Sequence, residues 1–207
     1  MQGSNLQVNC LFPSSVFVFD LEEHLFKLEQ IKTNYEYIDN SYSGSIGVSK
    51  SITNNILDYF PEEQNIIMNH FNYIKNKFMM YENNNFKMTT SWGVRCVEKS
   101  FSQYHCHKNS FYSGIYYLEQ TENTSYFEID AYNLFPSMFE ILPTKHNVYN
   151  STFWKIPPKK SRLIFFPSYL NHRIGENHSS NTRYSIAFNI MPIGEIGGGD
   201  SFVKMMI

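Results

Sequence analysis

Three of the seven histidines stand where they could bind a single metal ion. His105 and His107 lie two residues apart ahead of an apolar segment, and residues at this spacing on an extended chain point to the same side. His172 follows a second strongly apolar segment later in the chain. Such a pair with a distant third ligand, presented from a β-barrel mouth, is typical of non-haem iron oxygenases, whose metal keeps positions open for a co-substrate and oxygen. The spacing predicts iron(II) at these three histidines.

A basic and a hydroxyl side chain further along could hold an anion beside that metal. Arg183 and Ser185 flank Tyr184 in a segment with strand character, so alternation puts both on one face. A guanidinium fork and a hydroxyl can hold the far carboxylate of a dicarboxylate while the metal chelates its 2-oxo acid end. This pattern predicts 2-oxoglutarate as the co-substrate, with O2 at a remaining position on the metal.

The sequence alone leaves other interpretations of these side chains open. A histidine in a strand is most often structural, and Arg183 could instead form a surface ion pair. Structural zinc is the main competitor for the metal, but it prefers a closed set of four ligands, and Cys106 would point away from its two neighbours. The other histidines are interpreted as structural or surface residues: His24, His70, His146 and His178.

The first part of the chain, residues 1–87, is expected to be a helical support. Asp20–Glu23 offers an N-cap with an acid three residues on, and leucines follow at helical spacing. A second helix is expected from Pro61, because proline and acids suit the first turn. Its apolar stripe would consist of Ile67, Phe71, Ile74 and Phe78.

Residues 88–191 are expected to form a β-sandwich or barrel, followed by a tail at 192–207. Short segments rich in β-branched and aromatic residues alternate there with turn residues. With no internal repeat or linker, residues 1–207 are expected to form one domain of mainly β (α+β) class with helices packed outside. The expected strands are Met88–Val97, Phe111–Leu118, Ser125–Ile129, Thr152–Ile156, Arg162–Pro167 and Arg183–Ile190.

Composition excludes some classes of function. The net charge of −2 gives no basic field for a dedicated nucleic-acid-binding module. No segment has the plan of a signal peptide, and no apolar run is long enough to cross a membrane. Three scattered cysteines do not describe a disulfide framework, which favours a reducing compartment. We therefore expect a cytoplasmic protein.

The sequence around the candidate residues resembles a family of bacterial and phage 2-oxoglutarate- and iron(II)-dependent oxygenases. The likeness runs from about Leu11 to the end and is most specific between His105 and Asn189. It implies a double-stranded β-helix (a cupin-like jelly roll), and a hydroxylase that converts 2-oxoglutarate to succinate and CO2. For a phage-encoded member, the location would be the host cytoplasm. The matching segments are Ser91–Trp92, His105–Gly114, Ile115–Leu118, Leu163–His172, Arg183–Asn189 and Pro192–Ser201.

Prolyl hydroxylases of the same superfamily have similar Ile-Tyr-Tyr-Leu and Arg-Tyr segments. In those enzymes the second tyrosine and the arginine hold 2-oxoglutarate, which by resemblance points to Tyr117 and Arg183. Tyr116 and Tyr117 are adjacent and must face opposite ways, so one of them is expected only to pack. Asn109 could orient a ligand or simply form a turn. Trp92 is interpreted as a core residue, without chemistry.

One departure from the superfamily concerns the metal ligands. An acid usually stands two residues after the first histidine, whereas this chain has His107. Two alternatives therefore accompany the main interpretation. One is a three-histidine iron dioxygenase that does not use 2-oxoglutarate, and the other is a non-catalytic cupin-like phage protein with a binding or structural role. The primary substrate is not predicted, because the fold does not choose among substrates.

Overall fold

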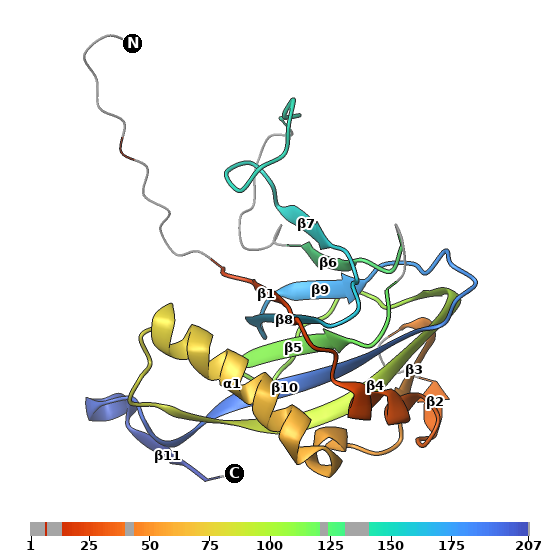
Figure 1. Ribbon diagram of the computed structural model, residues 1–207. Helices are drawn as coiled ribbons and strands as arrows, with labels where there is room; N and C mark the ends of the chain where they lie inside the picture. The colour runs from red at the N-terminus through yellow and green to blue at the C-terminus, as the bar shows by residue number, and fades with distance from the viewer. Residues whose placement is uncertain (1–6, 8–13, 40–43, 121–123, 131–140, 207) are drawn as a thin grey trace.

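The computed structural model describes residues 7, 14–39, 44–120, 124–130 and 141–206 and consists of two β-sheets with one α-helix outside them (Figure 1). The strands are β1 (Phe17–Asp20), β2 (Tyr37–Asp39), β3 (Ile46–Ser51), β4 (Asn85–Phe101), β5 (Tyr112–Tyr117), β6 (Phe127–Asp130), β7 (Phe153–Ile156), β8 (Arg162–Pro167), β9 (Asn171–Ile174), β10 (Arg183–Ile196) and β11 (Val203–Met205). The helical segments are α1 (Pro61–Lys77) and the 3-10 turns η1 (Phe26–Lys32), η3 (Ile56–Tyr59) and η4 (Gly199–Ser201).

The larger sheet has eight strands in the order β1-β8-β5-β10-β4-β3-β2, with β11 paired to β10. The smaller sheet has the order β7-β6-β9, and every strand pair in both sheets is antiparallel. From β7 to β10, successive strands lie alternately in the smaller and the larger sheet, and sheet neighbours such as β10 and β4 are far apart in sequence. This arrangement is the double-stranded β-helix, and the predicted mainly β jelly roll is confirmed.

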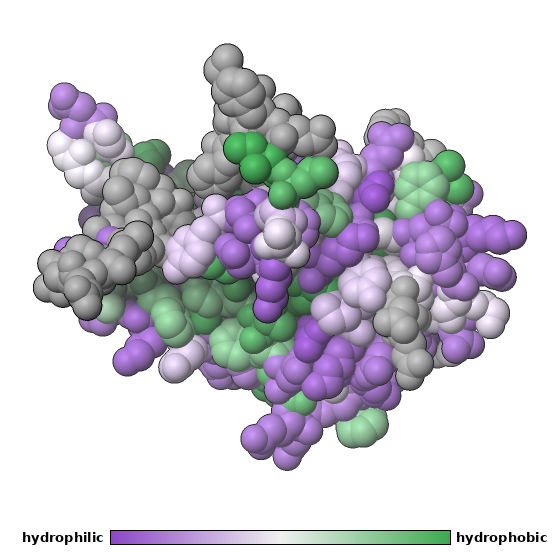
Figure 2. Space-filling view, turned by 90° about the horizontal axis from the view of Figure 1, so that it is seen from above, coloured by the Kyte–Doolittle hydropathy of each residue, from purple (hydrophilic) through white to green (hydrophobic). Residues whose placement is uncertain are grey.

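The middle strands of the larger sheet are buried on both faces. In β8, Leu163 and Phe165 pack on the side of α1, whereas Ile164 and Phe166 pack between the two sheets. Alternation across the sheet therefore explains why this strand is apolar throughout rather than at every second residue. The visible face in Figure 2 is mostly hydrophilic, with hydrophobic residues concentrated in a recess near its centre.

Helix α1 begins at Pro61, as predicted, and lies across the outer face of the larger sheet (Figure 1). Ile67, Phe71 and Ile74 are buried in the outer core. The prediction that Phe78 continues this stripe is wrong, because the helix ends at Lys77 and the Phe78 side chain is 59% exposed. No helix that the structure describes is long and apolar enough to span a membrane.

The helix expected from Asp20 is wrong. Asp20 is the last residue of β1, which pairs with β8 and places Asp20 opposite Arg162. The carboxylate accepts a hydrogen bond from Arg162 Nε at 2.7 Å, which is the main reason why its pKa falls to about 2. The Asp20 carboxylate is therefore bound to Arg162 across the strand pair and does not cap a helix. Only the 3-10 turn η1 follows β1 at this point in the chain.

Several strand limits also differ from the prediction. Residues 1–87 are not purely helical, because they include β1, β2 and β3 at the edges of the larger sheet. The tail expected at 192–207 includes the end of β10 and all of β11. Strands β4 and β10 pair with each other along most of their length. Because this pairing continues past the segments of strand-like composition, both strands are longer than predicted. Strands β9 and β11 were not predicted.

Gly114 of β5 tests how closely the outer core is packed. A Cβ at this position would collide with the ring of Phe188 and lie 2.7 Å from the carbonyl oxygen of Ile164. We predict that Gly114→Ala lowers the free energy of unfolding by roughly 1–3 kcal/mol, as overpacking does. Urea unfolding measures the change. The control Gly198→Ala meets no atom within 4 Å and should be close to neutral, and equal stability of the two variants would contradict the packing.

Candidate active site

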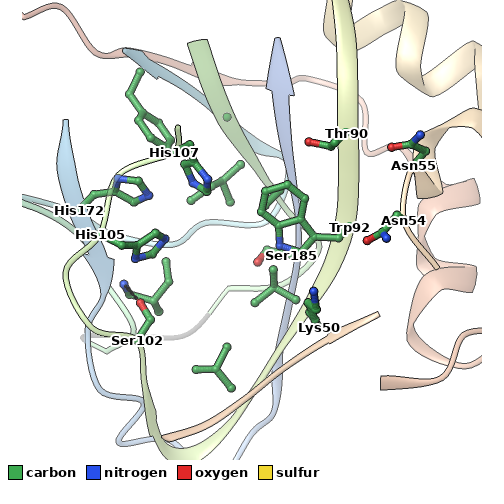
Figure 3. Close-up of a pocket in the computed structure, with 17 residues that line it drawn as sticks. Lys50, Asn54, Asn55, Thr90, Trp92, Ser102, His105, His107, His172 and Ser185 are labelled. Carbon is green, nitrogen blue, oxygen red and sulfur yellow. Dashed lines mark hydrogen bonds between the residues drawn. The ribbon is translucent and has the colours of Figure 1, made fainter. Parts of the chain in front are cut away.

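Three histidines converge at one end of the space between the sheets (Figure 3). One potential ligand atom from each of His105, His107 and His172 lies within 4.8 Å of the other two. We call these residues the histidine triad. His105 and His172 form an isolated antiparallel bridge, in which each backbone N–H donates to the other's carbonyl at 2.9 Å. The His107 N–H donates to Ser168 O at 2.9 Å, so backbone hydrogen bonds anchor every member of the triad.

Hydrogen bonds also set the orientation of two imidazole rings. His105 Nδ1 lies 2.8 Å from Gln103 O, and His172 Nδ1 lies 2.8 Å from Leu170 O. Because a carbonyl oxygen only accepts, each Nδ1 carries the proton and leaves the Nε2 lone pair available. Backbone carbonyls of this kind fix the tautomer of metal-binding histidines.

Burial keeps His107 and His172 neutral. It lowers the pKa of His107 to about 4 and the pKa of His172 well below its ordinary value, and neighbouring triad members lower both further. Neutral imidazoles are the form that binds a metal ion. Cys106 is exposed and does not belong to the cluster. The described residues therefore offer three candidate ligands, and the other coordination positions of a metal would stay open. A divalent iron fits this donor set better than structural zinc, which requires a closed set of four.

A cavity of about 620 Å³ extends from the triad between the sheets. Its walls come from β3, β4, β5, β8 and β10 of the larger sheet, from β9 of the smaller sheet, and from the loops that carry His105 and His107 and the pair Asn54 and Asn55. The apolar part consists of Val48, Trp92, Val94, Ile115, Phe166, Ile174 and Ala187, and the polar part outside the triad of Lys50, Asn54, Asn55, Thr90, Ser102 and Ser185.

Arg183 lies two residues before Ser185 on the inner face of β10 and is 0% exposed. Its Nη2 lies 2.9 Å from Cys96 Sγ, and its guanidinium stands over the Tyr117 ring, 5.2 Å from the centroid. Among the described residues, Arg183 Nε and Nη1 have no hydrogen-bond partner, and neither does the Tyr117 hydroxyl. A buried cation with unsatisfied donors is costly, so the site suits an anion. Arg183, Ser185 and Tyr117 are called the arginine cluster.

The two adjacent tyrosines face opposite ways. The Tyr116 hydroxyl accepts from the Leu25 N–H at 3.0 Å and lies 3.0 Å from His24 Nδ1, on the side of the sheet that packs against the outer core. Tyr117 is on the inner side with Arg183. Burial raises the pKa of the Tyr117 phenol, which therefore stays protonated and able to donate.

Two cavity residues were missed by sequence reasoning. Trp92 was interpreted as a core residue, yet it is only partly buried, and its ring lies 5.7 Å from that of His107. The alternation of β4 could have placed it on the inner face, but the cavity there could not be foreseen. Lys50 had no local signal, because β3 was not predicted. Asn109 is an exposed turn residue with a φ of 56°, and Phe165 is in the core.

Comparisons with known proteins agree with this geometry. Residues 90–189 match the family model described as "Putative 2OG-Fe(II) oxygenase". None of the curated proteins matches the sequence.

Several solved structures share the fold, at identities that show the fold alone. HygX from Streptomyces hygroscopicus, crystallised with nickel, 2-oxoglutarate and hygromycin B, has a TM-score of 0.54 and 10% identity over 86% of this chain and 82% of that one. A Pseudomonas putida prolyl-4-hydroxylase has a TM-score of 0.53 and 11% identity over 79% and 82%. A Trichoplax adhaerens prolyl hydroxylase bound to a peptide fragment of hypoxia inducible factor has a TM-score of 0.58 and 11% identity over 85% and 83%.

The span matched by the family model contains the whole histidine triad and the whole arginine cluster. The part of the chain that carries both clusters therefore matches the 2-oxoglutarate- and iron(II)-dependent oxygenases, a family of oxidoreductases that use Fe(II), 2-oxoglutarate and O2.

Proposed function

We propose that the histidine triad binds the iron(II) and that the arginine cluster holds the far carboxylate of 2-oxoglutarate, so that the enzyme hydroxylates an organic substrate. One observation carries this proposal. Three convergent imidazoles and a fully buried guanidinium with two unpaired N–H donors, among the described residues, lie on the inner walls of the same jelly roll. A dicarboxylate with a chelating 2-oxo acid end complements both groups.

Each part of the chain has a defined task in this proposal. The bound iron(II) supplies the oxidising chemistry, in which conversion of 2-oxoglutarate to succinate and CO2 accompanies substrate oxidation. The triad positions the metal through its backbone hydrogen bonds, and Arg183 neutralises a carboxylate that would be costly to bury alone. The apolar walls formed by Ile115, Phe166 and Ile174 limit the access of water to the metal.

The two alternative functions are less well supported. A three-histidine dioxygenase that does not use 2-oxoglutarate would leave Arg183 as a buried cation without an anion. A non-catalytic binding protein has no need for two histidines oriented through Nδ1 hydrogen bonds. A cytoplasmic location, and the host cytoplasm for a phage-encoded member, form part of the proposal through the family resemblance.

The first functional prediction concerns the metal. His172→Ala removes a ligand with a fixed Nε2, so we expect iron(II) affinity to fall by at least about 100-fold. His107→Asp should retain the metal, because a carboxylate is the usual ligand type in such triads. Anaerobic titration with Fe(II) measures both, with His178→Ala in an exposed loop as the matched control. Iron affinity in His172→Ala equal to that of the control would refute the triad.

The second functional prediction concerns Arg183. Arg183→Lys keeps the charge but loses the fork, so 2-oxoglutarate affinity should fall by about tenfold or more while iron binding is retained. Arg183→Met should abolish 2-oxoglutarate binding yet raise the melting temperature of the ligand-free protein, because it removes an unpaired buried charge.

Calorimetry under anaerobic conditions measures the 2-oxoglutarate affinity, and thermal unfolding measures the melting temperature. Succinate formation by the parent enzyme distinguishes the proposal from a dioxygenase that does not use 2-oxoglutarate. Unchanged 2-oxoglutarate affinity in Arg183→Met would contradict the assigned role.

A further inference from the structure

Lys50 contributes a cation to the active-site cavity and takes no part in the proposed co-substrate site. We propose, on the basis of the function above, that Lys50 binds an acidic group of the primary substrate. The substrate is then a small molecule that carries a carboxylate or phosphate on a flat body, and this body stacks on Trp92.

The position of Lys50 is fixed by the sheet. Strand β3 lies between β2 and β4, and Lys50 pairs with Ile38 on one side and Val94 on the other. Because side chains alternate along a strand, Ser49 and Ser51 point to the outer face and Lys50 points into the cavity. On the outer face, the two serine hydroxyls donate hydrogen bonds to the Asp39 carboxylate and the Thr53 carbonyl. The Lys50 side chain is only partly buried, and the described residues give its ammonium group no ion pair or hydrogen bond. It is therefore a positioned and available cation.

The charge of the cavity favours an anionic substrate. Its described lining contains no aspartate or glutamate. The double charges of iron(II) and 2-oxoglutarate cancel in the sum, so Arg183 and Lys50 together give the loaded site a net positive charge. The acid that usually stands at position 107 would have offset one of them, but this chain has histidine there. A neutral or cationic substrate would leave the excess positive charge unpaired.

Trp92 provides the surface for the rest of the substrate. Its indole stands between the histidine triad and the Lys50 side of the pocket in Figure 3, within 5.7 Å of the His107 ring. A flat molecule on this indole would have one end near the metal and its acidic end near Lys50, with the amides of Asn54 and Asn55 at the exposed rim. The volume of about 620 Å³ is typical of a small-molecule site.

The test uses the iron(II)-loaded, oxygen-free enzyme and matched probes, with and without saturating 2-oxoglutarate. Calorimetry compares 1-naphthoate and 1-naphthyl phosphate with the neutral 1-naphthamide. We expect at least one acid to bind about tenfold more tightly than the amide, and the better acid identifies carboxylate or phosphate as the group recognised. Lys50→Met should remove this preference and leave amide binding unchanged. Lys50→Arg should keep most of it, and Trp92→Ala should weaken acid and amide alike.

Lys77→Met, at the exposed end of α1, controls for loss of a lysine charge and should match the parent. Equal binding of acids and amide, no binding of any probe, or a preference that survives Lys50→Met would each overturn the proposal. A loss of 2-oxoglutarate affinity in Lys50→Met would also overturn it, because Lys50 would then belong to the co-substrate site. Failure of the parent enzyme to bind 2-oxoglutarate contradicts the proposed function instead, and the comparison of acid with amide still decides the role of Lys50.

Discussion

The active site depends on the backbone bridge between His105 and His172. Two reciprocal N–H···O bonds of 2.9 Å join the segment before β5 to β9, and they place two imidazoles on the same side of the bridge. A third bond, from the His107 N–H to Ser168 O, fixes the remaining ring. Backbone geometry rather than side-chain packing therefore sets the triad, because antiparallel pairing leaves directly opposite side chains only a few ångströms apart.

The larger sheet supports this bridge by being buried on both sides. One face carries the outer core under α1, and the opposite face carries the cavity wall and Arg183. Alternation along β10 separates the two tasks, so that Ile186 and Phe188 stabilise the fold while Ser185 and Arg183 face inward.

The positive charge of the cavity depends partly on the presence of histidine rather than an acid at position 107. Histidine at position 107 adds no negative charge to the candidate metal ligands among the described residues, whereas an acid there would have contributed one. With Lys50 on the opposite wall, the cavity has an excess of positive charge, and the nature of the primary substrate is expected to reflect this. Small changes in ligand type can therefore alter substrate preference without any change in fold.

Local sequence determined much of this protein. The spacing of His105 and His107, the Arg-x-Ser pattern at 183–185 and the apolar run Leu163–Phe166 identified the chemistry and the central strands, because alternation acts over neighbouring residues. Only the tertiary structure decided the rest. Asp20 ended a strand because Arg162 lay opposite it, Tyr117 rather than Tyr116 faced inward, and Lys50 and Trp92 lined the cavity. Each of these outcomes depends on pairing between segments distant in the chain, which local propensity does not encode.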